Sequence, residues 1–384
     1  MRLAFTPEQA DLRDATRRFL TASSPISEVR RLMATDAGYD TGVWASMAGQ
    51  LDLLGLVLPE EYGGSGGGWT DLVVVLEEMG RALLCAPFLA TVALAGAAVA
   101  ACPDEDLQAD VLPAIADGRL IATVATAEDA GSWDDDGVRL RGDVTPDGWR
   151  LTGHKSFVLD GQTADLVLVS ARTEHGLSLF AVDGTAPGLS RRRLEVLDPT
   201  RKLARLKFAA VAARLIGAEG QASELLQRVR DLGAVALAAE QIGGAARCLE
   251  MSVEYAKLRY QFGRPIGSFQ AIKHMCADML VDLEWARSAV YEAAWAIDEG
   301  HGTLPADASL AKACASQAFA QIADRAIQIH GGIGFTWEND LHLYFRRAKS
   351  GELLFGTPTY HREQFMRRIA LTPYASETAI TSPQ

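Results

Sequence analysis

The sequence predicts an α+β fold of several domains: a helical N-terminal domain, a middle β-barrel or β-sandwich domain and a C-terminal four-helix bundle. Three observations predict it: helix start signals near the N-terminus, a change to short strand-like segments near Ile121, and a proline-free stretch over 222–260. A single core stops growing near ~250–300 residues, so a chain of 384 residues is expected to contain more than one domain. We place the domains at 1–120, 121–221 and 222–372, followed by a tail at 373–384.

The first domain begins with a helix signal. Thr6-Pro7-Glu8-Gln9 provides an N-cap, a proline at the first helical position and a glutamine at N3, and this combination predicts a helix through Phe19. Glycines and Pro59 interrupt the next stretch at 58–68. No Lys-Ser/Thr pair follows these glycines, so we interpret the segment as a connector and not as a phosphate-binding loop. Helical patterns return over 70–78 and 90–101.

The middle domain is predicted from its turns. Pro146-Asp147-Gly148, Asp160-Gly161 and Asp183-Gly184 separate short apolar segments, and no helical pattern lies between them. Short strands at this spacing are typical of a β-sandwich or a barrel.

The last domain is predicted to contain long helices. Helical patterns cover 222–260, 269–299, 306–330 and, more briefly, 360–371. Long helices joined by short connections pack as an antiparallel four-helix bundle.

Composition excludes several classes of partner. The net charge of -12 argues against binding to nucleic acid or to an anionic membrane surface. No apolar run approaches the ~20 residues of a membrane span. The N-terminus does not have the pattern of a signal peptide, and the five cysteines are scattered, so a cytoplasmic protein is expected. The seven histidines form no metal-binding pair, and no metal is expected.

Two segments of the last domain have the residues of a dinucleotide contact. The first segment contains Arg259, Phe262, Gly263 and Gln270 in this order. The guanidinium of Arg259 suits a bidentate contact with a pyrophosphate. Gln328 precedes Gly331 and Gly332, whose lack of a Cβ allows close approach of backbone to a phosphate or ribose. Both segments resemble signatures of the acyl-CoA dehydrogenase family, flavoenzymes that desaturate acyl-CoA thioesters between the α and β carbons. The resemblance implies that these residues contact the FAD of a neighbouring subunit.

The middle domain resembles the same family with changes. Thr126, Gly131 and Ser132 match a family segment that lies along flavin and substrate. In a second segment the family has a tryptophan that packs on the flavin and a threonine that bonds to flavin N5. Here those positions are Phe157 and Leu159, so the hydroxyl donor is absent.

The catalytic base is also missing. Gly356 and Thr357 match a family segment whose glutamate removes the α-proton, and the glutamate position is Phe355. The other place where family members carry a base aligns with Gly233, beside Ala234. Glu240 lies two turns further along that helix and is a candidate displaced base, although a paired helix glutamate is the better interpretation. Glu352 and Glu363 are interpreted as solvated charges.

The resemblance implies FAD as cofactor and an acyl-CoA as substrate. The residues that hold this chain's own flavin are changed, whereas those that contact a neighbour's FAD are retained. We therefore expect the base-lacking subunit of an actinobacterial-type α2β2 acyl-CoA dehydrogenase, with a homologous glutamate-bearing partner and an electron-transferring flavoprotein as acceptor. Such split enzymes are associated with bulky substrates such as steroid side-chain thioesters.

Three alternatives stay open: self-association as a self-contained dehydrogenase that uses Glu240, a flavin monooxygenase on the same scaffold, and a structural subunit without flavin.

Overall fold

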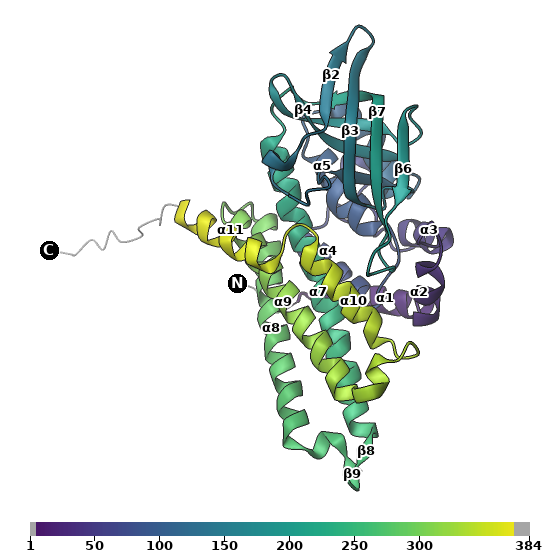
Figure 1. Ribbon diagram of the computed structural model, residues 1–384, viewed down its shortest axis with the longest axis vertical. Coiled ribbons are helices and arrows are strands. Elements are labelled where there is room, and N and C mark those ends of the chain that lie inside the picture. The colour runs from purple at the N-terminus through teal and green to yellow at the C-terminus, as the bar shows by residue number, and fades with distance from the viewer. Residues whose placement is uncertain (1–4, 372–384) are drawn as a thin grey trace, which may run out of the picture.

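The computed structural model describes residues 5–371, so the tail expected at 373–384 lies outside the described residues. A β-domain occupies one end of the long axis, a bundle of long helices forms the other, and the N-terminal helices pack where the two meet (Figure 1). None of the helices within 5–371 is both long and apolar enough to span a bilayer. The helical, β and helical order expected from the sequence is confirmed.

The N-terminal part contains six α-helices and a buried π-helix. The capping box predicted at Thr6 is present, because its hydroxyl accepts a hydrogen bond from Gln9 N and its own N–H donates to Gln9 Oε1, both at 3.2 Å. The helix expected at 90–101 is a π-helix followed by one short α-helix, and three further helices had no clear signal in the sequence. The helices are α1 (Pro7–Ser23), α2 (Ile26–Met33), α3 (Thr41–Gly49), α4 (Trp69–Arg81), the π-helix η2 (Leu89–Gly96), α5 (Ala97–Ala100) and α6 (Glu105–Ala116).

The glycine-rich segment before α4 is a compact connector. Gly63 has a φ of +79°, and a Cβ on Gly64 would lie 2.1 Å from the carbonyl oxygen of Leu58. Glycine is therefore required here by close backbone packing, and not by a phosphate ligand.

The middle domain is a seven-stranded sheet that closes on itself. Its order is β1-β4-β2-β3-β7-β5, and β5 also pairs with β4. Strand β6 pairs with residues 204–208 of β7, whereas β5 pairs with residues 214–216 of β7. The ring from β4 through β2, β3, β7 and β5 back to β4 makes this a barrel, one of the two predicted forms. The strands are β1 (Ala122–Ala125), β2 (Arg141–Thr145), β3 (Gly148–Leu159), β4 (Leu166–Thr173), β5 (Gly176–Asp183), β6 (Leu189–Arg193) and β7 (Leu203–Ile216).

The C-terminal part is a bundle around α9, which packs against α7, α8, α10 and α11. The four predicted helices are present, and α10 is an addition that the sequence patterns missed. A short hairpin, β8 (Tyr260–Gln261) and β9 (Arg264–Pro265), forms the end of the bundle furthest from the barrel (Figure 1). The helices are α7 (Ser223–Leu258), α8 (Gln270–Asp298), α9 (Leu304–His330), α10 (Leu341–Leu353) and α11 (Pro358–Leu371).

Helices α4 and α7 cross with their backbones in contact. A Cβ added at Gly80 would lie 1.9 Å from the carbonyl oxygen of Glu240, and one at Gly243 would lie 1.8 Å from that of Glu77. Neither glycine can be replaced without moving a helix backbone. This close crossing anchors α4 on the bundle at the level of Glu240.

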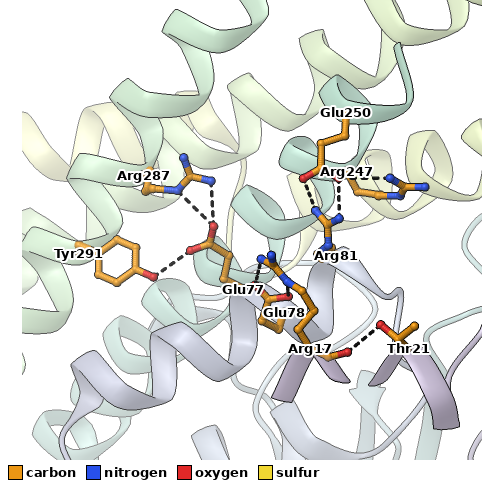
Figure 2. Close-up of polar contacts among 9 residues, drawn as sticks. All are labelled: Arg17, Thr21, Glu77, Glu78, Arg81, Arg247, Glu250, Arg287 and Tyr291. Atoms are coloured by element: carbon orange, nitrogen blue, oxygen red, sulfur yellow. Dashed lines mark hydrogen bonds and ion pairs between the residues drawn. The ribbon is translucent and has the colours of Figure 1, made fainter. Parts of the chain in front are cut away.

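Adjacent glutamates on α4 extend this junction through ion pairs (Figure 2). Glu77 accepts hydrogen bonds from Arg287 at 2.9 and 3.1 Å and from the Tyr291 hydroxyl at 2.8 Å, both on α8. Glu78 points to the other side and forms a two-point contact with Arg17 of α1 at 2.6 and 2.8 Å. Both carboxylates are almost fully buried, so loss of one partner would leave a buried charge and strongly destabilise the junction.

Candidate active site

Phe355 lies on the turn between α10 and α11, in the left-handed backbone region with a φ of +59°. A non-glycine residue rarely adopts this conformation unless its surroundings enforce it. The enforcing groups are two buried side chains. His361 Nε2 donates to the carbonyl oxygen of Phe355 at 2.9 Å, and Lys312 Nζ donates to those of Gly351 and Gly356 at 2.9 and 3.1 Å.

Burial sets the charge of these two groups. It lowers the pKa of Lys312 to about 7, and no carboxylate within residues 5–371 contacts its ammonium group. Burial, together with the charge of the nearby Lys312, lowers the pKa of His361 to about 3. His361 is therefore a neutral donor through Nε2, and its buried Nδ1 has no partner in the described part of the chain. No sequence motif points to either residue, although a lysine among alanines on α9 is an unusual core residue.

The Phe355 ring is buried against Trp133 and Gly233. It contacts Trp133, with ring centroids 5.2 Å apart, and a Cβ added at Gly233 would lie 3.4 Å from its edge. The two positions at which the family resemblance predicts a base are thus neighbours in space, and neither carries a carboxylate. The same added Cβ would lie 2.6 Å from Leu94 of the π-helix.

The cavity beside Phe355 is about 20 Å³, which is room for about one water molecule. Leu159 lies in its wall with its side chain buried, so this position offers no hydroxyl donor. Arg230 also reaches the wall, one turn before Ala234, but it is paired with Asp135 at 2.8 Å. The cavity is lined by Leu94, Val124, Thr126, Ala127, Trp133, Ser156, Phe157, Val158, Leu159, Val229, Arg230 and Phe355.

A second cavity, of about 500 Å³, lies on the other side of Trp133 and Phe157. Its walls are mainly apolar, and they include Leu203 of β7 and Leu353 at the end of α10. Ser132 and Thr357 also line it, but their hydroxyls already accept backbone N–H groups of Asp134 and Tyr360 at 3.2 Å. Its volume is suited to a ring system, and its polar groups are few. Its walls are Gly131, Ser132, Trp133, Asp134, Phe157, Val196, Leu197, Leu203, Lys349, Ser350, Leu353, Leu354, Gly356, Thr357 and Tyr360.

Thr126 and Phe157 are positioned by a buried ion pair. Lys155 Nζ donates to the Thr126 carbonyl oxygen and to Glu128 Oε1, both at 2.9 Å, and burial lowers its pKa to about 8. A bulge after Lys155 leaves Phe157 at a φ of +57°, partly exposed on the cavity wall.

Glu240 is a buried, paired glutamate. Its carboxylate contacts the guanidinium of Arg201, and Arg347 lies at 3.6 Å. Arg347 also binds Asp198 at 2.9 Å, so Arg201, Glu240, Arg347 and Asp198 form a chain of ion pairs between the barrel and the bundle.

The other two carboxylates considered from the sequence are paired as well. Glu352 binds Lys349 at 2.9 Å and Glu363 binds Arg367.

The residues expected to contact a neighbour's FAD lie elsewhere. Arg259 and Phe262 are exposed at the hairpin end of the bundle, and Phe262 is 90% exposed with a φ of +53°. Gln270, Gln328, Gly331 and Gly332 are also exposed, at the starts and ends of α8 and α9. None of these six lines either cavity, and Figure 1 places the hairpin far from the barrel. Across residues 5–371 there is no cluster of acids, cysteines and histidines able to hold a metal ion.

Comparison with known proteins identifies relatives over nearly the whole chain. Residues 6–119, 122–211 and 224–370 match the N-terminal, middle and C-terminal domains of acyl-CoA dehydrogenase. The acyl-CoA dehydrogenase IpdE2 of Mycobacterium tuberculosis is 36% identical over 354 residues, which cover 91% of this chain and 94% of that protein.

Solved structures also resemble the chain over nearly its whole length. A variant of the Tcur3481-Tcur3483 steroid ACAD matches with 33% identity and a TM-score of 0.86 over 94% of this chain and 98% of that one. The ChsE4-ChsE5 complex from Mycobacterium tuberculosis matches with 29% identity and a TM-score of 0.88 over 97% and 100%.

Proposed function

Since the chain belongs to the acyl-CoA dehydrogenase family of FAD-binding flavoproteins, we propose that it is the non-catalytic subunit of a heteromeric acyl-CoA dehydrogenase. The observation that carries this proposal is the tight packing around Phe355, which we call the filled site. Phe355, at the position predicted for the base, packs against Trp133 and faces Gly233, and only about 20 Å³ is left beside it. An acyl thioester has no room there, and none of the residues lining the cavity is an acid.

Removal of an α-proton requires a carboxylate within hydrogen-bond reach of the α-carbon. The candidate on α7, Glu240, is held by Arg201 and Arg347 in a network that joins two domains. Two guanidinium partners stabilise its charge, and movement toward a substrate would leave both arginines buried without it. This supports a partner subunit as the source of the base.

FAD fits one part of this chain better than the other. When bound, it accepts the hydride from the β-carbon of the substrate. We call the two cavities beside Trp133 and Phe157 the inner site. There, Phe157 stands in place of the expected tryptophan and Leu159 provides no donor to flavin N5, so the flavin ring would be weakly held. We call the exposed residues at the hairpin end of the bundle the outer site. There, Arg259 would hold the pyrophosphate of a partner's FAD. Gln328, Gly331 and Gly332 would admit the adenosine part, because they are exposed and unobstructed.

The relatives favour the same arrangement. One solved neighbour is named as the ChsE4-ChsE5 complex, and another is named as the Tcur3481-Tcur3483 steroid ACAD. We extend this to a homologous glutamate-bearing partner in an α2β2 assembly and to a bulky lipid or steroid thioester as substrate. An electron-transferring flavoprotein as acceptor and a cytoplasmic location are further expectations of this proposal.

A self-contained flavoenzyme is the second candidate, because the cavity of about 500 Å³ could admit a flavin ring. It includes a monooxygenase that removes no α-proton.

Flavin content separates these candidates. The chain is purified alone and after co-expression with a glutamate-bearing homologue, and flavin absorbance is measured per protein. We expect little flavin in the lone chain, and close to one FAD per pair, with acyl-CoA oxidation, in the complex. Full occupancy and turnover by the lone chain would establish the self-contained enzyme. Absence of flavin from the complex would establish a structural subunit.

A further inference from the structure

The loop between β1 and β2 has two ends that are tied together. Glu128 Oε1 accepts the backbone N–H groups of Arg139 and Leu140 at 2.8 and 2.9 Å. Glu128 is itself held by the buried Lys155 at 2.9 Å, so this base of the loop is rigid. We refer to residues 129–138, which lie between the tied ends, as the capping loop. A loop of this length with joined ends is an Ω-loop, a class of surface loop that is frequently functional.

The tip of the capping loop is held by three contacts from outside the loop. The Tyr360 hydroxyl of α11 donates to Asp134 Oδ1 at 2.5 Å. Arg230 of α7 binds the Asp135 carboxylate at 2.8 Å, and Arg172 of β4 donates to the Asp135 carbonyl oxygen at 2.6 Å. Two of these contacts join the barrel to the bundle. All three depend on side chains, so they can break without the loss of any helix or strand.

The tip also carries Trp133, which covers Phe355. Its ring is partly exposed and packs on the Phe355 ring with centroids 5.2 Å apart. Trp133 lies in the walls of both cavities, the one of about 20 Å³ and the one of about 500 Å³. Gly131 precedes the tip with a φ of +72°, and no atom lies within 4 Å of an added Cβ, so the backbone has room to rotate there. Rotation at Gly131 would carry Trp133 away from Phe355 while the ends of the loop stay joined.

We infer that the capping loop is a lid that pivots near Gly131 and is held closed by Tyr360 and Arg230. In the open state Phe355 is uncovered, and the two cavities, which share Trp133 as a wall, join. Lids of this kind pivot on a few loop residues and control access to a site. Burial and the bond to Asp134 raise the pKa of Tyr360, so its hydroxyl stays a donor at neutral pH. The inference goes beyond the proposed function, because it holds whichever subunit supplies a base.

Hydrogen–deuterium exchange of the full chain, measured by mass spectrometry on overlapping peptides, tests the lid. Tyr360→Phe and Asp134→Ala remove the same contact, and each should speed exchange of the amides of 134–138 about ten-fold. The amides of Arg139 and Leu140, which tie the loop ends, should exchange as before. The double variant should exchange no faster than the faster single variant, because the two changes remove one contact.

The chain offers a matched control for each substitution. Tyr62→Phe removes a hydroxyl that bonds to Gln108 at 3.1 Å in the N-terminal domain. Asp136→Ala removes the third acid of the tip, whose exposed side chain has no hydrogen-bond or ion-pair partner within residues 5–371. Both controls should leave exchange of the capping loop unchanged.

Access to Phe355 provides a second measurement. In a Phe355→Cys variant, labelling of the new thiol by methyl methanethiosulfonate, located by mass spectrometry, should be about ten-fold faster with Tyr360→Phe than with Tyr62→Phe. Faster exchange of the loop without faster labelling would overturn the inference, because the loop would not cover this position.

Two other results would also overturn the lid. Equal exchange in Tyr360→Phe and Tyr62→Phe would show that the hydroxyl does not hold the loop closed. Equal acceleration at the tip and at Arg139 and Leu140 would show local unfolding and not a pivot. If Tyr360→Phe also speeds exchange within α9, the bundle has been destabilised, and the comparison of Asp134→Ala with Asp136→Ala then decides, since both acids lie on the exposed tip.

Discussion

Replacement of Phe355 by glutamate restores the residue type of an acyl-CoA dehydrogenase base and provides the sharpest test of the filled site. The new carboxylate would lie against the Trp133 ring and near Leu94, beside a cavity of about 20 Å³. Lys312 of α9 already bonds to two carbonyl oxygens of this turn, and Arg230, which lines the same cavity, is paired with Asp135. The glutamate would therefore be buried without a dedicated partner.

Two terms determine how much Phe355→Glu lowers the free energy of unfolding. Truncation of a buried phenylalanine to alanine costs about 3–5 kcal/mol, and the two methylenes of glutamate return about 1.6 kcal/mol of that. A buried polar group without a partner costs a further ~1–3 kcal/mol. We expect a loss of about 2–6 kcal/mol in the free energy of unfolding. Burial would also raise the pKa of the new carboxyl, so the folded state would bind a proton that the unfolded state has lost, and stability would fall as pH rises above ~4.3.

Urea unfolding of the flavin-free chain at pH 6 and pH 8 measures both effects, with Phe355→Gln as the uncharged control. The glutamate variant should be less stable at pH 8 than at pH 6, and the glutamine variant should show much less of this dependence. Neither variant should oxidise acyl-CoA efficiently when expressed alone. Stability within ~1 kcal/mol of the unmodified chain, or rapid turnover, would show that the pocket is open and otherwise intact.

Three further predictions concern other parts of the molecule. Arg259→Ala in the assembled complex should weaken FAD binding about ten- to a hundred-fold, because it removes a charge-assisted contact of ~1.5–3 kcal/mol, and excess FAD should restore much of the turnover. Arg259→Lys should recover only part of the affinity, since an ammonium group lacks the two-point geometry. Gly243→Ala should lower the free energy of unfolding by at least ~2 kcal/mol, since its Cβ would lie 1.8 Å from a backbone oxygen of α4. On acidification from pH 7 to pH 5, neutral His361, whose pKa is lowered to about 3, should contribute a loss of up to ~2 kcal/mol, because the unfolded state takes up a proton below pH ~6.5 and the folded state does not. His361→Gln should reduce this slope in a thermal unfolding series.

A specific experimental result would refute each of these three predictions. Unchanged flavin retention after Arg259→Ala would show that this chain does not contact its partner's FAD. Gly49→Ala, at a helical glycine with no atom within 4 Å of the added Cβ, is the control for Gly243→Ala, and equal stability of the two variants would refute the close crossing. A pH slope that is unchanged in His361→Gln would assign the acid sensitivity to other groups.

Local signals in the sequence were sufficient for much of the fold. The capping box at Thr6 and the long proline-free helix α7 depend on residues within a few positions of one another, and both were predicted. Helix α10 was missed because its buried residues alternate with charged ones such as Arg346 and Lys349, which weakens the apolar period. That Phe355 carries no carboxylate and Leu159 no hydroxyl could likewise be read directly, because a side chain's chemistry does not depend on the fold.

What surrounds those side chains was decided by tertiary structure alone. The contact of Phe355 with Trp133 and Gly233, the pairing of Glu240 with Arg201 and Arg347, and the hold of Lys312 on the turn all join segments about 40 or more positions apart. The contacts of Tyr360 and Arg230 with the capping loop depend on the packing of the barrel against the bundle, which no local pattern encodes. The sequence determined which chemical groups this protein has and lacks. Packing decided which of them meet, because burial, close contact and charge pairing arise only when distant segments are brought together.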